Sequence, residues 1–168
     1  LKIYTTINSK MQKYAEEAVV EHMKNLQKEF FMQNDTVSSA PFTDLEEDEE
    51  DLIMKRAMRR SERWRKAKLS GKTNDEIEEL FFEPKNMTVF SWDGDIDTLM
   101  TPIDSIRYYK HFLRAGMMSM NPKNGHVKAW VGGINYRNFQ YDHVMLSKRQ
   151  IGSTFKPFLY ATAIDQLK

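Results

Sequence analysis

Residues 149–158 read Arg-Gln-Ile-Gly-Ser-Thr-Phe-Lys-Pro-Phe. A glycine and a serine precede an aromatic, apolar run that continues to Ile164, which predicts a helix beginning near Ser153. Pro157 agrees with that start, because proline is tolerated in the first turn of a helix. Ser153 and Lys156 are three residues apart, so their side chains should lie on the same side of this first turn.

This serine and lysine suit nucleophilic catalysis. A serine hydroxyl is a weak nucleophile until a neighbouring group takes its proton. A lysine can do so only in its neutral form, which burial or nearby cations favour, and Phe155, Pro157 and Phe158 would desolvate Lys156. A helix N-terminus also favours developing negative charge. A capping serine followed by a surface lysine has the same spacing, so the catalytic interpretation depends on the surrounding sequence.

Composition limits the classes of function. The 168 residues suffice for one domain or parts of two, and a net charge of +1 gives no overall field that would gather nucleic acid. The absence of cysteine excludes disulfides and thiolate metal sites. We expect no cofactor and no metal. The chain starts at Leu1 and ends at Lys168 within an apolar helical run, so we expect a segment of a longer protein.

The first 35 residues predict a strand and a helix. Residues 2–7 alternate and are rich in β-branched side chains, which is typical of a strand. Asn8 or Ser9 can cap the following helix. An apolar stripe at three- and four-residue steps predicts that this helix continues to about Phe31; its members are Met11, Ala15, Ala18, His22, Leu26 and Phe30. We assign His22 no chemistry, and we expect a loop over residues 33–41.

Residues 36–100 are dominated by charge. An acidic run at 46–51 precedes a basic stretch from Lys55 to Lys68, an order that matches the dipole of one helix ended by Gly71. The basic half has an alternative interpretation as a stripe that binds nucleic acid or anionic lipid. A solvated helix whose charges neutralise each other is favoured. A short helix over 73–82, capped by Thr73 or Asn74, a strand over 87–92 and a turn at 93–95 should follow.

The remaining residues predict a helix, a hairpin and a loop before residue 149. Thr101 and Pro102 begin the helix. Residues 117–121 and 126–131 should be antiparallel strands joined by a turn with Asn124 and Gly125 at its tip. Gly132 and Gly133 should end the second strand, and a polar, aromatic loop then covers 135–150. The overall fold class is α+β.

Three of these stretches resemble the class A penicillin-binding proteins. In that family a D-P-x-T-G turn and a V-G-G strand end precede R-Q-x-G-S-x-x-K-P. Here residues 121–125 read N-P-K-N-G, residues 131–133 read V-G-G, and residues 149–157 match the last motif. The opening residues 5–16 are similar to the family's linker between its glycosyltransferase and transpeptidase domains. Residues 58–64 and 141–144 resemble the Bacteroidetes branch, while 36–100 carry no general family motif.

The resemblance implies an incomplete serine transpeptidase/β-lactamase-like domain. Residues 1–35 would be the linker strand and helix, 36–100 a charged helical insertion, and 101–168 the N-terminal part of the transpeptidase domain. Ser153 would attack the penultimate D-alanine carbonyl of a peptidoglycan stem peptide, with Lys156 as general base. β-Lactams would trap Ser153 as a slow ester. The family's S-x-N and K-T-G motifs follow the S-x-x-K helix, so we expect this chain alone to be inactive.

The same resemblance implies a location and partners. The parent protein, bifunctional and cross-linking stem peptides, would act at the extracytoplasmic (periplasmic) face of the bacterial inner membrane, anchored through a segment outside this chain. Its ligands would be D-Ala-D-Ala stem peptides and β-lactams, its partners other cell-wall synthesis proteins, and nucleic acid would not be bound. An alternative is a non-catalytic interaction or linker module that docks partners through residues 36–100.

Overall fold

The computed structural model describes residues 2–35, 41–43 and 45–166, and its elements are mixed helices and small antiparallel sheets. The helices are α1 (Ser9–Asn34), α2 (Glu47–Arg59), α3 (Glu62–Leu69), α4 (Asn74–Phe82), α5 (Pro102–Lys110) and α6 (Lys156–Gln166), with a 3₁₀ turn η1 (Gly152–Phe155) before the last. The strands are β1 (Lys85–Val89), β2 (Ile96–Met100), β3 (Met117–Met120) and β4 (Val127–Val131). The α+β prediction is confirmed.

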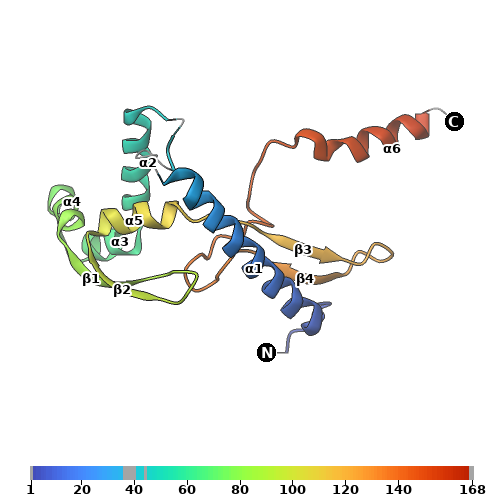
Figure 1. Ribbon diagram of the computed structural model, residues 1–168, viewed down its shortest axis with the longest axis horizontal. Coiled ribbons are helices and arrows are strands. Elements are labelled where there is room, and N and C mark those ends of the chain that lie inside the picture. The colour runs from blue at the N-terminus through green and yellow to red at the C-terminus, as the bar shows by residue number, and fades with distance from the viewer. Residues whose placement is uncertain (1, 36–40, 44, 167–168) are drawn as a thin grey trace.

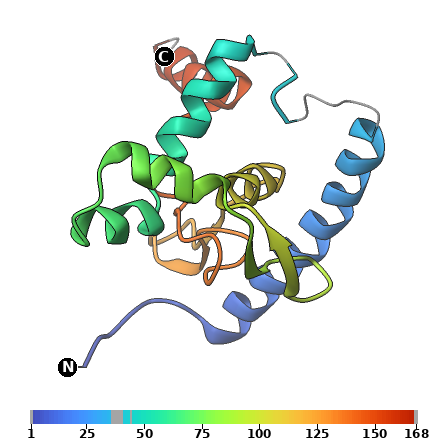
Figure 2. The ribbon, with the colours of Figure 1, turned by 90° about the vertical axis from the view of Figure 1, so that its left-hand side faces the viewer.

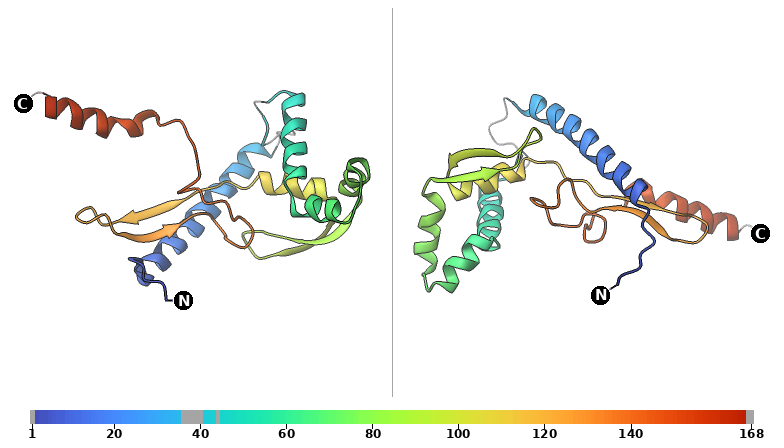
Figure 3. Two further views of the ribbon diagram at one scale, coloured as in Figure 1. Left: turned by 180° about the vertical axis from the view of Figure 1, so that it is seen from behind. Right: turned by 90° about the horizontal axis from the view of Figure 1, so that it is seen from below.

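The long helix α1 crosses the β3–β4 hairpin and packs against β4 (Figure 1). Elements α2 to α5 and the β1–β2 hairpin gather at one end of the molecule (Figure 3). The chain then returns through β3, β4 and a long loop to α6, which extends away from the other elements (Figure 1). Among the described residues, no helix combines the length and apolar character that a membrane crossing requires.

Helix α1 begins where Asn8 accepts a hydrogen bond from the Met11 amide at 3.0 Å, as predicted. It continues to Asn34, so Gln33 and Asn34 are helical instead of part of the expected loop, while residues 36–40 lie outside the described part. Its buried row is Ala15, Val19, Met23 and Gln27, four residues apart. The predicted stripe was therefore only partly right, because apolar spacing gave no reason to bury a glutamine, and His22 is exposed.

The strand prediction for residues 2–7 is wrong. This segment is exposed and runs away from the start of α1 (Figure 2), and none of the described strands pairs with it. Its bonds to β4 come from Thr6, whose hydroxyl donates to the Val127 carbonyl at 2.7 Å and whose carbonyl accepts from Lys128 Nζ at 3.4 Å; the Asn8 amide, next along the chain, donates to the Lys128 carbonyl at 2.9 Å. A β-branched composition favours an extended backbone, but a strand also requires a ladder of main-chain partners.

The prediction of one helix across the charged block is also wrong, because the chain bends at Ser61 between α2 and α3. The Ser61 hydroxyl donates to the Met58 carbonyl at 2.7 Å and accepts from the Trp64 amide at 3.2 Å. Residues six apart on a straight helix point about 120° away from each other. The bend lets both Met58 and Trp64 enter one core with Ile77 and Phe81.

The predicted end of this block and the helix after it are confirmed. Gly71 has φ +86°, and the amides of Gly71 and Lys72 donate to the carbonyls of Lys68 and Ala67 at 3.0 and 3.3 Å. This is a Schellman motif, which satisfies carbonyls at a helix end. Helix α4 starts at the Thr73 cap, where Thr73 and Glu76 form a reciprocal capping box.

Two antiparallel hairpins complete the described fold. The strand predicted over residues 87–92 is present as β1, but it begins at Lys85 and ends at Val89, and its partner β2 was not expected from the sequence. Helix α5 begins at the Thr101 cap with Pro102 in its first turn, as predicted. The β3–β4 hairpin is confirmed, with an irregularity between Ser119 and Met120. Its inner face joins α1 in the larger core, which contains Ala15, Val19, Met23, Phe90, Phe112, Ala129, Val131, Ile134 and Phe139.

Candidate functional site

The predicted serine and lysine lie at the junction of two helical elements. Gly152, with φ +53°, opens the 3₁₀ turn that carries Ser153, and Lys156 is the first residue of α6. The predicted helix is present, but its α-helical part starts three residues after Ser153. Both side chains are exposed, and within the described residues neither takes part in a side-chain hydrogen bond or ion pair.

The apolar surroundings expected for Lys156 are not formed by the described residues. Phe155 is 52% exposed and Phe158 is 67% exposed. The centroids of their two rings are 5.9 Å apart. Every described residue of α6 is exposed. The structure therefore places Ser153 and Lys156 three residues apart at one helix start, and no side chain of the described residues bonds to either of them.

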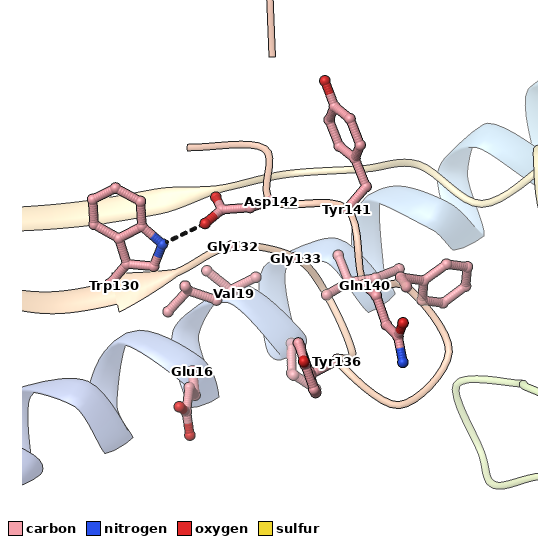
Figure 4. A pocket seen from close by; sticks show the side chains of 13 residues that line it. Glu16, Val19, Trp130, Gly132, Gly133, Tyr136, Gln140, Tyr141 and Asp142 are labelled. Carbon is pink, nitrogen blue, oxygen red and sulfur yellow. Dashed lines mark hydrogen bonds between the residues drawn. The ribbon is translucent and has the colours of Figure 1, made fainter. Parts of the chain in front are cut away.

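The loop that leads to this helix is anchored on β4 by Asp142 (Figure 4). The Trp130 indole donates to Asp142 Oδ2 at 2.9 Å, while the amides of Val144 and Met145 donate to Oδ1 at 2.9 and 3.0 Å. Desolvation opposes the charged carboxylate, but these hydrogen bonds outweigh it and the pKa of Asp142 is lowered. A Cβ on Gly132 would lie 3.0 Å from Asp142 Cγ, so any larger residue at position 132 would make Asp142 shift by a few tenths of an ångström.

A cavity of about 540 Å³ lies between α1 and this loop (Figure 4). Its walls combine a carboxylate from α1, aromatic rings and the bare backbone of Gly132 and Gly133. Ser153 and Lys156 do not line it. No group of three histidine, cysteine, aspartate or glutamate side chains suited to a metal ion occurs among the described residues.

A second serine, which sequence analysis missed, contacts a histidine in the same loop. His143 Nδ1 lies 3.1 Å from Ser147 Oγ. Partial burial lowers the pKa of His143, and the positive charges of Arg114 and Arg149 act in the same direction. A neutral histidine can accept a serine proton. The Asp142 carboxylate is bound to Trp130 and to two amides, so the described residues form a pair and not a triad.

Arg114 supports this loop from the side of the larger core. Its guanidinium lies 3.8 Å from the centroid of the Phe139 ring and donates to the Tyr109 carbonyl at 2.8 Å. Burial lowers the pKa of Arg114 to about 10, so the side chain remains a cation at neutral pH. A cation held over an aromatic face in this way fixes the position of the loop.

Comparison with known proteins gives partial matches. Residues 37–113 match the family described as penicillin-binding protein middle domain. This range covers most of the charged segment 36–100, in which no family motif was found from the sequence, and it also includes α5. No solved structure matches the chain.

Penicillin-binding proteins 1A from several bacteria are similar to part of the chain. The Pseudomonas aeruginosa protein is 38% identical over 52 residues, which is 31% of this chain and 6% of the relative. The Escherichia coli protein is 39% identical over 54 residues, 32% of this chain and 6% of the relative. The Vibrio cholerae protein is 43% identical over 49 residues, which is 29% of this chain and 6% of the relative. The matched part thus spans 6% of these relatives, and over parts of its length the chain is similar to penicillin-binding proteins of the 1A type.

Proposed function

We propose that this chain is part of a class A penicillin-binding protein whose transpeptidase domain cross-links peptidoglycan through Ser153. The stretch 149–158 carries the proposal, because it combines a nucleophile and a lysine at one helix start within a nine-residue family motif. The middle-domain match at residues 37–113 supports it, since that segment precedes the motif in the same chain. The similarities at 58–64 and 141–144 favour the Bacteroidetes branch.

In the proposed reaction, Ser153 Oγ attacks the carbonyl carbon of the penultimate D-alanine in a stem peptide. The neutral amine of Lys156 takes the hydroxyl proton as the C–O bond forms. The amide C–N bond then breaks, and the terminal D-alanine leaves with a proton on its amine. An amine from a neighbouring stem attacks the resulting ester, forms the cross-link and releases Ser153. A β-lactam ring would open by the same attack and leave an ester that hydrolyses slowly.

The backbone at the helix start supports this chemistry. A helix N-terminus directs amide groups and a partial positive charge toward an oxyanion. Gly152 carries no side chain and adopts a positive φ, so a substrate backbone could approach closely before Ser153. The exposed apolar residues around Lys156 would supply its desolvation once another part of the protein covers them.

We divide the chain into a linker (1–35), a middle segment and the start of the transpeptidase domain. The middle-domain match ends at residue 113, and Ile103 and Ile106 of α5 pack on the core of α2 to α4. These two observations favour a boundary after α5. We further propose that the parent protein carries a glycosyltransferase domain and is anchored in the inner membrane, with this part on the periplasmic side.

The test is labelling of the parent protein with a fluorescent penicillin. Ser153→Ala should abolish labelling, because the ester cannot form without the hydroxyl. Ser147→Ala is the matched control, since it removes the loop serine that contacts His143 and should leave labelling intact. Lys156→Met, which keeps the length of the side chain, should slow labelling by about 10²-fold or more, as expected for loss of a general base. Retained labelling in Ser153→Ala, or its loss in Ser147→Ala, would sink the proposal.

A further inference from the structure

Helix α2 carries an exposed row of side chains whose charge changes sign along its length. Asp48, Leu52 and Arg56 are four residues apart, so they lie on one face of the helix. All three are exposed, and Leu52, at the centre, is 49% exposed. The opposite face buries Met54 and Met58. Figure 1 shows α2 at the outside of the molecule, away from β3 and β4.

The charges at the two ends of this row have no partner in the part of the chain that the structure describes. Neither Asp48 nor Arg56 forms an ion pair with another side chain of the described residues. Lys55, beside Arg56, reaches Asp51 only at 4.0 Å. The row therefore presents an anion, an apolar side chain and a cation in that order.

We propose that this face binds the same face of a second copy, with the two α2 helices antiparallel. If the two-fold axis passes through Leu52, residue 48 of one copy faces residue 56 of the other. Both ends of the contact then pair Asp48 with Arg56, and the two leucines meet on the axis. The helix dipoles also oppose each other favourably in this arrangement. Such a self-complementary patch is what an isologous dimer requires.

The charge order selects this partner over an anionic membrane or a nucleic acid. Either of those would attract the Arg56 end of the row and be repelled by the Asp48 end. One pair of short helices buries less than the roughly 1,000 Å² of a stable interface, so the contact is weak and depends on a high local concentration. It does not depend on the chemistry of Ser153.

Charge reversal tests the pairing by sedimentation of the purified chain at low salt. Asp48→Arg alone and Arg56→Asp alone each place like charges opposite each other at both ends, and each should weaken self-association by about tenfold. A one-to-one mixture of the two variants, and the double variant Asp48→Arg/Arg56→Asp, should restore it. The inference is overturned if single reversals leave association unchanged, or if the mixture fails to restore it.

Cysteine cross-linking tests the axis independently, because the native chain has no cysteine. Leu52→Cys should form a disulfide-linked dimer under mild oxidation. Leu69→Cys is the matched control: this side chain, at the end of α3, is 78% exposed and so is more accessible to random collision than Leu52. Faster cross-linking at position 52 supports the axis. Equal or slower cross-linking at position 52 contradicts it.

Discussion

Replacing Gln27 with methionine should lower the free energy of unfolding substantially, although only one side chain changes. Gln27 is fully buried on α1, with no exposed surface. Its Nε2 donates to the His111 carbonyl at 2.9 Å, and its Oε1 accepts from the Leu113 amide at 2.7 Å. The Gln27 amide group therefore both donates to and accepts from the backbone that follows α5, as a neighbouring β-strand would. These two hydrogen bonds join α1 to that segment.

Methionine has a similar volume but cannot make either hydrogen bond. The Leu113 amide and the His111 carbonyl would both lose their partner, and an unpaired buried polar group costs about 1–3 kcal/mol. We expect the free energy of unfolding to fall by about 2–4 kcal/mol in total, because partial relaxation offsets some of the cost. In a chain of this size the melting temperature would drop by roughly 5–15 °C.

Gln12→Met is the matched control for urea unfolding. Gln12 makes the same pair of bonds to the backbone of Trp130, at 2.9 and 2.7 Å, but it is only half-buried. Water can replace its bonds, so we expect a loss of about 1 kcal/mol. The reasoning is refuted if Gln27→Met costs no more than Gln12→Met, or if either variant changes the denaturant slope instead of the midpoint.

Three further predictions concern the loop and the charged block. Gly132→Ala should push Asp142 away from the Trp130 indole, seen as a change in tryptophan fluorescence, whereas an unchanged spectrum would contradict the close contact. Ser61→Ala should lower the free energy of unfolding by about 1 kcal/mol through loss of the α3 cap; no change in the urea midpoint would argue against the bend. Burial lowers the pKa of His143 in the folded state, so this side chain binds a proton more readily in the unfolded chain. The contribution of His143 to the free energy of unfolding should therefore be constant above pH 6.5 and fall below it. His143→Gln should reduce that acid loss, and an identical pH profile in both proteins would refute this.

Local signals in the sequence predicted the local features well. Asn8, Thr73 and Thr101 each cap a helix, since a cap depends on a side chain and amides two or three residues away. The β3–β4 turn was equally readable, because Gly125 adopts the positive φ that such a turn requires. The same locality explains the Schellman motif after α3.

Features that depend on distant partners were missed. Gln27 is buried because a backbone segment more than eighty residues later needs its amide, which no apolar pattern reveals. The bend at Ser61 follows from placing Met58 and Trp64 in one core. The pairing of β2 with β1 and the contact of Ser147 with His143 were also invisible, although the four-residue spacing of the latter offered a weak signal.

Peptide mapping of the penicillin-treated parent protein tests the central claim most directly. Trypsin cleaves after Lys148 and Arg149 but resists the Lys156-Pro157 bond, so Ser147 and Ser153 fall in different peptides. The peptide that begins at Asn138 and ends at Lys148 contains Ser147, and the peptide that begins at Gln150 contains Ser153 as its sole serine up to Lys168. We predict that the mass of the opened β-lactam is found on the peptide beginning at Gln150, at Ser153. Its presence on the peptide containing Ser147, or on neither, would contradict the proposed acyl-enzyme.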